Sequence, residues 1–328
     1  MKKILSLALA LLLVLGLTAC GEPKEPTIEK LDVTANVFAI KGPTGVGMAP
    51  LMDKAEKNEG LLNYKFNLVG SNEEIVAKIG NKEADIAAVA TNLASTLYNK
   101  TNGGVSVIAI NTLGVLSVIA KGEEIETVKD LKGKTILTTG QGANPEYIIN
   151  YILEKNGLKV GEDVTLKFVT QPTELIAHVN LSDKAIVIAP QPVATNIILK
   201  NNQAKIVLDI NKEWDKVSDT ELVMGCVIAR NEFIEQNPEA VKAFLKDYKD
   251  SITAVNSDIE TAAALCEKYG IVSPAAAAKK AIPYCNIAFQ EGKELKTNLS
   301  AYLNFLNNSN PQSIGGALPK DDFYYEAK

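Results

Sequence analysis

Short apolar runs alternate along the chain with segments whose apolar residues recur every three or four positions. The first pattern is typical of buried strands and the second of amphipathic helices. The first third predicts strands at 31–40, 64–69 and 85–90, helices at 46–59, 72–81 and 92–98, and two apolar, β-branched runs at 105–110 and 113–120. This alternation predicts an α/β fold.

The pattern restarts after Gly122 with a short helix at 128–133, a strand at 135–137 and a glycine-rich turn at 138–142. Pro145 then lies just inside a helix that ends at Gly157, where its missing N–H costs nothing. Strands are predicted at 164–169, 185–188 and 204–208, and helices at 173–179 and 192–201. Trp214 is expected in a loop at 211–217.

One further strand is predicted at 222–229, and the chain then becomes mostly helical. Asn237-Pro238 opens a long helix whose apolar residues recur at spacings of three and four. Helices are also predicted at 259–269, 275–282 and 295–306, whereas the tail at 314–325 has no regular period. With 328 residues the chain is long for one core, so two lobes are expected.

The N-terminus has the organisation of a secretory signal. Lys2 and Lys3 precede sixteen uncharged residues, and the run Leu-Thr-Ala-Cys ends at Cys20. Sixteen helical residues span about 24 Å, short of the ~30 Å hydrocarbon core, so this segment would be a poor permanent membrane span. An ordinary secretory signal that happens to contain a cysteine is the alternative to a lipid-attachment signal.

The polar residues 21–27 contain two prolines and predict a short tether, so the folded part is expected to begin near Leu31. Cleavage before Cys20 would leave 309 residues and change the net charge from −5 to −7, because Lys2 and Lys3 would be removed. A mildly acidic chain without a basic block is a poor nucleic-acid binder.

Three cysteines remain after Cys20, an odd number that cannot all pair within one chain. Cys266 and Cys285 could form a disulfide, whereas Cys226 lies in an apolar strand pattern and is expected to pack as a small hydrophobe. No metal-ligand spacing is present and His178 is the only histidine, so neither a metal nor a cofactor is expected.

The order of elements from residue 33 to 324 resembles that of type 2 periplasmic binding proteins, in the branch that binds nitrate, taurine, sulfonates and the thiamine pyrimidine precursor. Several stretches carry this resemblance. They are 123–136, 140–157, 163–169, 189–195, 227–245, 318–319 and 321–324. The match at 227–245 is the most specific. In 189–195, Gln191 replaces the Glu that this family usually has. The run that ends at Cys20 likewise resembles the bacterial lipobox, in which the cysteine is lipidated.

The resemblance implies a two-lobed fold with a ligand cleft between the lobes, which close by hinge motion. The expected division is a signal peptide at 1–19, a tether at 20–30, lobe 1 at 31–120 plus 221–328, and lobe 2 at 121–220. It also implies a monomeric solute-binding lipoprotein, anchored on the extracytoplasmic face of the membrane, that delivers its ligand to the permease and ATPase subunits of an ABC importer.

Ligands of α/β sheets gather beyond the carboxyl ends of the strands. Four segments follow predicted strands there, and their candidate ligand-binding residues are Thr44, Gly45, Asn92, Thr139, Gly140, Gln141 and Gln191. Two of the segments are glycine-containing helix starts, whose N–H groups favour anions. None of the four contains an arginine, so the ligand is either an anion held by N–H and hydroxyl donors or a neutral molecule.

Five further positions have weaker support. Leu113 and Gly114 lie where the chain could cross between lobes, and Tyr147 lies one turn into its helix. Trp214 could stack on a ligand or pack near a hinge, and His178 is expected to be a surface or packed residue.

Two other functions remain open. An enzyme is the first, because a related fold serves a pyrimidine-precursor synthase. However, the sequence contains no Gly-x-Ser-x-Gly elbow, metal set or paired Cys/His candidate. A ligand sensor that presents its closed form to a membrane kinase is the second, and the sequence does not separate it from a transport protein.

Overall fold

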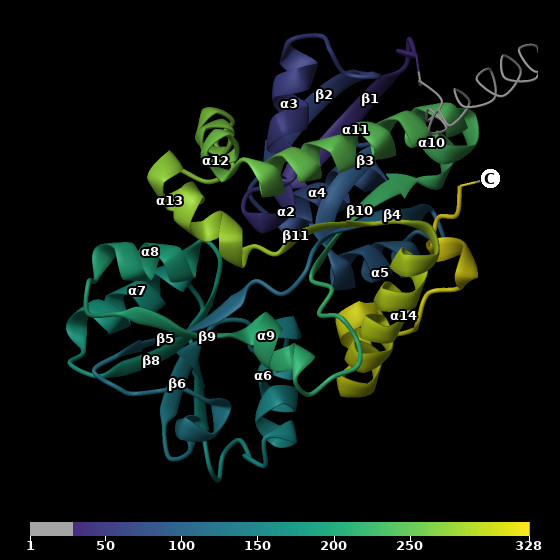
Figure 1. Cartoon of the computed structure of the whole chain (residues 1–328). Coiled ribbons are helices and arrows are strands. Elements are labelled where there is room, and N and C mark those ends of the chain that lie inside the picture. Colours follow the sequence, from purple (N-terminus) through teal and green to yellow (C-terminus); the bar gives the residue numbers. More distant parts are fainter. Residues whose placement is uncertain (1–28, 328) are drawn as a thin grey trace, which may run out of the picture. The chain divides into compact units, whose positions relative to one another are not determined.

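The computed structural model describes residues 29–327 (Figure 1). The predicted signal peptide, the lipidation site at Cys20 and most of the tether lie outside the described residues. The mixed α/β architecture that the sequence predicts is confirmed, with two separate sheets.

The first sheet has six strands in the order β11-β4-β10-β3-β1-β2. Their bounds are β1 Thr34–Ile40, β2 Asn63–Val69, β3 Ile86–Ala90, β4 Val105–Thr112, β10 Gly225–Arg230 and β11 Ile287–Gln290. Strand β1 runs parallel to β2 and β3, whereas β10 is antiparallel to both β3 and β4. All eight residues of β4 are buried, as its apolar sequence predicts for a central strand.

The second sheet has five strands in the order β7-β6-β8-β5-β9. Their bounds are β5 Leu116–Lys121, β6 Thr135–Thr138, β7 Thr165–Phe168, β8 Ala185–Pro190 and β9 Lys205–Asp209. Val118 and Ile119 are consecutive in β5, and their side chains enter two different apolar clusters because neighbours in a strand face opposite sides. Both faces of this sheet are therefore covered, as an apolar central strand requires.

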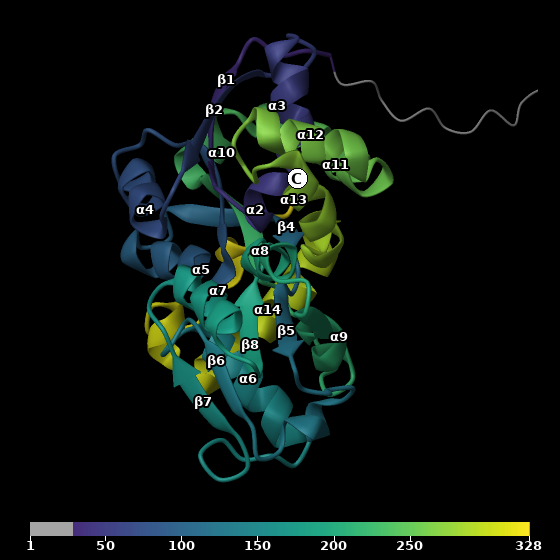
Figure 2. The same ribbon diagram turned by 90° about the vertical axis from the view of Figure 1, so that its left-hand side faces the viewer.

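Helices cover the two sheets (Figures 1 and 2). The α-helices are α2 Pro43–Val46, α3 Ala49–Glu56, α4 Asn72–Gly80, α5 Thr91–Lys100, α6 Asn144–Lys155, α7 Pro172–Leu181, α8 Val193–Lys200, α9 Ile210–Asp215, α10 Asn231–Gln236, α11 Pro238–Ser257, α12 Ile259–Lys268, α13 Ala275–Ala281 and α14 Gly292–Ser309. Four 3₁₀ turns are described, η1 Val128–Leu131, η2 Ile282–Tyr284, η3 Pro311–Ile314 and η4 Asp321–Phe323. The N-cap that the sequence predicts for α4 is confirmed, because Ser71 Oγ accepts the Glu74 N–H at 3.3 Å.

Three local predictions are wrong. The helix expected at 46–59 begins earlier, at Pro43, and is divided into α2 and α3. The helix expected at 128–133 is a single 3₁₀ turn. Trp214 is not in a loop but in α9, where its buried ring packs against Tyr151 and Phe305 and its indole N–H is bonded to the Thr220 carbonyl.

Strand β11 was not predicted from the sequence. Its four residues are too few to show a period, and it is stabilised by antiparallel pairing with β4, a partner far away in the chain. The strand fills the edge of the six-stranded sheet next to β4.

All three cysteines of the described part are buried and free, so the disulfide considered between Cys266 and Cys285 is not formed. The prediction that Cys226 packs as a small hydrophobe is confirmed by its complete burial in β10. Burial raises the pKa of both Cys266 and Cys285 to about 12, which leaves their thiols protonated and unreactive at neutral pH.

The chain passes from the first sheet to the second at Leu113–Val115, between β4 and β5. The boundary expected near residue 120 therefore lies too late, because β5 is hydrogen-bonded within the second sheet. The return passage follows α9 and ends where β10 begins at Gly225. Below, "first lobe" and "second lobe" denote the six-stranded and five-stranded sheets with their covering helices.

Candidate ligand-binding site

Unpartnered polar atoms are concentrated where strands end. Among residues 29–327, seven buried side-chain polar atoms lack a hydrogen-bond partner. Five of them belong to Thr91, Asn111, Thr112, Asn144 and Gln191, which we call the interlobe polar set. A buried unpaired polar group costs roughly 1–3 kcal/mol, so each of these atoms is a candidate contact for a bound polar partner.

Asn111 and Thr112 end β4 in the first lobe and were not predicted as site residues. The Asn111 amide Nδ2 donates to the Thr44 carbonyl at 3.1 Å and to the Tyr248 hydroxyl at 3.0 Å, so its Oδ1 remains without a partner. Their only sequence signal is an Asn-Thr pair that closes an apolar run, immediately before the chain crosses to the second lobe.

Gly225 is required beside this pair because the backbone approaches very closely. A Cβ at this position would lie 2.7 Å from Thr44 Cγ2, 2.8 Å from Asn111 Oδ1 and 2.9 Å from Thr112 Cβ. The same distances show that Thr44, Asn111 and Thr112 lie together around one point at the end of the first sheet.

Asn92 was predicted to face the ligand, but its side chain is turned elsewhere. Its Nδ2 donates to the Ser313 carbonyl at 3.4 Å, so it holds η3 near the start of α5. The neighbouring Thr91 is fully buried, and its hydroxyl has no oxygen or nitrogen partner; it faces only the Cys226 sulfur, a weak acceptor to which the hydroxyl can donate. Thr91 is therefore the better candidate of the two.

Gln191 is 3% exposed and directly follows β8 in the second lobe. Its Oε1 accepts from the Thr195 hydroxyl at 2.8 Å and from the Thr195 N–H at 3.3 Å. Its backbone N–H donates to the Val115 carbonyl at 3.0 Å. Helix capping thus uses one end of the side-chain amide, and its Nε2 remains buried and unpartnered.

The glycine-rich turn after β6 satisfies part of its own hydrogen bonding. Glu146 Oε2 accepts the Gly142 N–H at 2.6 Å, and the Tyr147 hydroxyl donates to the Gly142 carbonyl at 2.8 Å. One N–H expected to bind an anion is therefore already bonded to a carboxylate. Gly140 has φ +84°, and Gln141 is exposed.

Thr139 is half-buried at the start of this turn, and Asn144, which is 6% exposed, follows the turn at the first position of α6. Gly45 lies in α2, where a Cβ would come within 2.8 Å of the Ile40 carbonyl oxygen. Close packing at that turn therefore requires glycine at position 45, and this requirement does not depend on ligand binding.

The remaining candidates have structural contacts. Trp214 is part of the aromatic core, and Tyr147 accepts a hydrogen bond from Asn310 Nδ2 at 2.8 Å, which links α6 to the end of α14. His178 lies in α7, with Ser182 Oγ at 3.4 Å from its Nδ1.

A continuous chain of contacts connects the two halves of the interlobe polar set. Gln191 is bonded to Val115, which follows Thr112 by three residues, at most about 11 Å of extended chain. On the other side, α8 packs against α13 of the first lobe, and the two helices lie side by side in Figures 1 and 2. Ile271, a few residues before α13, accepts the N–H of Gly42 at the start of α2.

The site-forming side chains carry no charge. The only arginine of the chain, Arg230, is bonded to Asp85 at 2.7 Å and to Glu232 at 2.9 Å, beside β3 and β10. Because β10 begins at Gly225 and ends at Arg230, this guanidinium lies at the opposite end of the strand from Asn111 and Thr112. Every member of the interlobe polar set is neutral.

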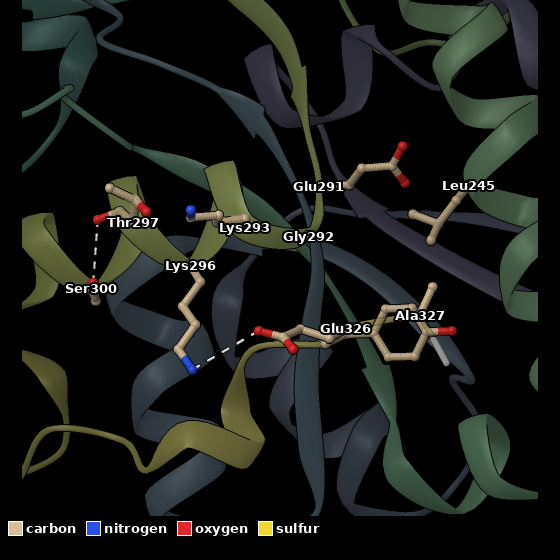
Figure 3. Close-up of a pocket in the computed structure, with 10 residues that line it drawn as sticks. Leu245, Glu291, Gly292, Lys293, Lys296, Thr297, Ser300, Glu326 and Ala327 are labelled. Carbon is tan, nitrogen blue, oxygen red and sulfur yellow. Dashed lines mark hydrogen bonds and ion pairs between the residues drawn. The ribbon is translucent and has the colours of Figure 1, made fainter.

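The larger cavities among those described lie elsewhere. One of about 950 Å³ is formed by the first turns of α14 and the C-terminal residues, where Lys296 is paired with Glu326 (Figure 3). Another of about 530 Å³ lies beside α10 and the same C-terminal residues. No predicted site residue lines either cavity.

Two α/β lobes are joined by crossover segments. This topology is the fold of type 2 periplasmic binding proteins. The model of the NMT1/THI5-like family matches residues 57–262, and the chain belongs to that family. No curated protein matches the sequence.

Solved structures agree on the fold. An ABC transporter protein from Parabacteroides distasonis is 20% identical with a TM-score of 0.75, covering 90% of this chain and all of that one. The aliphatic sulphonate binding protein SsuA from Escherichia coli is 14% identical with a TM-score of 0.69, covering 90% of this chain and 92% of its own. Candida albicans CA3427, described as having the generic periplasmic binding protein fold, is 14% identical with a TM-score of 0.53, covering 89% and 93%.

Within residues 29–327, no helix combines the length and apolar character needed to cross a membrane.

Proposed function

We propose that this protein is the solute-binding lipoprotein of an ABC importer, which captures a small polar organic molecule between its lobes and delivers it to the permease. Family membership and the similarity to binding proteins of known structure support this function. The observation that carries it is the interlobe polar set, because side chains from both lobes leave buried hydrogen-bonding atoms unused on either side of one crossover.

The proposed site combines the interlobe polar set with Thr44, Gly45, Thr139, Gly140 and Gln141, while Asn92 supports it through η3. Closure would bring the two lobes onto the ligand and satisfy the unpartnered atoms. Ligand binding would then stabilise the folded state by mass action, by about 2.7 kcal/mol at a ligand concentration one hundred times Kd.

Mass spectrometry of small molecules that copurify with the mature chain, followed by thermal unfolding with the identified compound, tests this function. We expect one molecule per chain and a higher Tm. Thr139→Val should weaken binding without lowering the Tm of the free protein. A native preparation that contains no small molecule and shows no Tm increase with sulfonates, pyrimidines, oxyanions or other metabolites would contradict the proposal.

A further inference from the structure

The C-terminal half of α14 forms a contact between the lobes in addition to the two crossovers. The ring of Phe305 lies edge-to-face against Trp214 of α9 and Tyr151 of α6, with centroids 4.9 and 5.2 Å apart. Tyr302, one turn earlier in α14, lies 6.4 Å from Trp214. Such pairs are favourable at these distances, and α14 also contacts α6 (Figures 1 and 2). The rings therefore form one aromatic cluster shared by both lobes.

A hydrogen bond joins the lobes beside these rings. Asn310 Nδ2, at the end of α14, donates to the Tyr147 hydroxyl of α6 at 2.8 Å. The Tyr147 O–H in turn donates to the Gly142 carbonyl at 2.8 Å, so the hydroxyl both accepts and donates. The glycine-rich turn of the second lobe is thus held to α14 through a single side chain.

The η3 turn that follows Asn310 is fixed to the first lobe. The Ile314 carbonyl accepts from Ser95 Oγ at 2.8 Å and from Asn99 Nδ2 at 3.1 Å, and both donors belong to α5. Movement of the second lobe away from α5 must therefore separate Asn310 from Tyr147 or displace the glycine-rich turn.

These contacts have the character of a surface that can separate. The residues that face each other across the lobes are half-buried, namely Tyr147, Tyr151, Phe305 and Asn310. Trp214 behind them is fully buried. Contacts of this mixed kind are typical of parts of one chain that move relative to each other. Separation would remove Phe305 from Trp214, whereas Tyr151, 5.0 Å away in the same lobe, would stay beside it.

We propose that Phe305 and Asn310 form a latch, which holds the lobes of the free protein in the arrangement described here and releases Trp214 and Tyr147 together when the lobes separate. The latch needs no ligand, so it goes beyond the proposed function. It would still affect the apparent affinity for any ligand, since a ligand that requires separated lobes must also break these contacts.

Pulsed electron paramagnetic resonance on the ligand-free mature chain measures the distance between the lobes. In a Cys20→Ser background, Leu181→Cys in α7 and Asp250→Cys in α11 place one spin label on each lobe. Leu181 is 88% exposed and the Asp250 side chain 57% exposed, so both labels are accessible. The three cysteines of the described residues are buried and stay unlabelled.

Three variants distinguish the latch from general loosening of the fold. Phe305→Ala combined with Asn310→Ala, the latch variant, removes the ring and the donor. Tyr147→Phe keeps its ring and removes only the hydroxyl on the second lobe. Phe66→Ala combined with Asn308→Ala is the matched control, because Phe66 is a half-buried ring that packs within the first lobe and Asn308 is exposed near the same helix end.

We expect the latch variant to populate a second interlobe distance, with the ratio of separated to latched molecules raised at least tenfold. Tyr147→Phe should raise the same ratio about two- to tenfold, the effect of one net hydrogen bond. Trp214, the only tryptophan of the chain, should become more accessible to acrylamide in the same order of variants. The control should match the parent protein.

An unchanged distance in the folded latch variant, or an equal change in the control, would overturn this inference. If the latch variant does not fold, an unchanged distance in Tyr147→Phe decides against the latch in the same way. Because no ligand is added, the result is independent of whether the proposed transport function holds.

Discussion

Asn211 Oδ1 accepts the backbone N–H of Gly114 at 3.0 Å, which ties the first crossover to helix α9 of the second lobe. From the first lobe, Asn286 Nδ2 donates to the Gly114 carbonyl, and the Asn286 carbonyl accepts the Leu113 N–H at 3.0 Å. Both polar groups of Gly114 are thus bonded to side chains from opposite lobes. The crossover is therefore a joint held by hydrogen bonds from both lobes.

Gly114→Ala should therefore impair the joint. The added Cβ would lie 2.6 Å from Asn211 Oδ1 and 2.8 Å from Leu222 Cδ2, so overpacking of about 1–3 kcal/mol is expected. Urea unfolding should show this loss, and ligand affinity should fall with it. Asn211→Ala in the same background removes the closest of the three contacts, that with Oδ1, while the Cβ of residue 211 remains 2.8 Å away. It should restore part of the stability, whereas no coupling between the two substitutions would argue against this geometry.

Asp247 should be among the carboxylates that matter most for stability. Its side chain is fully buried and accepts from Lys54 Nζ at 2.5 Å, from the Leu61 N–H at 2.7 Å and from the Tyr64 hydroxyl at 2.8 Å. Asp247→Asn keeps the shape and removes the charge. We expect a loss of about 3 kcal/mol, at the lower end for a broken buried pair because Lys54 is one-third exposed.

Asp250→Asn provides the matched control for that substitution. Asp250 lies on the same helix, is 57% exposed and pairs with Lys246 at 3.7 Å. The Asp250→Asn substitution should change the free energy of unfolding of the protein by less than about 0.5 kcal/mol. Equal losses for the two variants would show that burial of Asp247 does not determine its contribution.

Acid should weaken the contact between α3 and α12. Hydrogen bonds from Lys57 and Lys268 lower the pKa of Asp53 from 3.8 to about 2. A folded-state pKa below the unfolded value means that this stabilisation is present above about pH 4 and is lost as the pH falls toward 2. Lys268→Ala removes one of these partners, so its deficit relative to wild type should be largest at pH 5 and shrink by pH 2.5.

Urea unfolding at several pH values checks that expectation, with Lys246→Ala as a surface-lysine control. The pairs are near the surface, so 1 M NaCl should reduce the difference. A deficit for Lys268→Ala that is independent of pH would indicate lost packing of the lysine stem instead of lost charge pairing.

The apolar pattern of the sequence predicted most strands and helices, because a buried element needs apolar residues at regular positions along its own segment. Strands β4 and β5 are fully buried, and most of their residues are apolar. The sequence could not reveal β11, because its position depends on pairing with β4, or the helical position of Trp214, because α9 has only six residues. Contacts with distant parts of the chain determine both β11 and the helix that contains Trp214, so neither leaves a periodic pattern in the local sequence.

The structure shows where the candidate site residues lie, but it does not test which of them bind a ligand. Gln191 lies at the carboxyl end of its strand and has a free amide group, and the glycine-rich turn has the expected position. Asn92 is turned toward Ser313, and Asn111 was missed, because a sequence gives strand ends but not the direction of a side chain. Which of these residues contact a ligand stays a prediction.

Lipidation is the remaining prediction, and it concerns Cys20, outside the described residues. Cys20→Ser removes the thiol that would carry the diacylglyceryl group, so we expect the protein to lose its lipid mass and to leave the membrane fraction. Thr18→Ser keeps the Leu-Ser/Thr-Ala/Gly-Cys pattern and should stay anchored.

The anchor should act on uptake and not on binding. A short tether raises the effective concentration of the receptor near its permease without a new contact. The purified Cys20→Ser domain should therefore bind its ligand with unchanged affinity while cells that carry it take up less ligand. Fractionation, intact-protein mass spectrometry and uptake assays measure the three outcomes. Membrane retention of Cys20→Ser would contradict the lipid anchor, and a lower affinity of the soluble domain would contradict the separation of anchoring from binding.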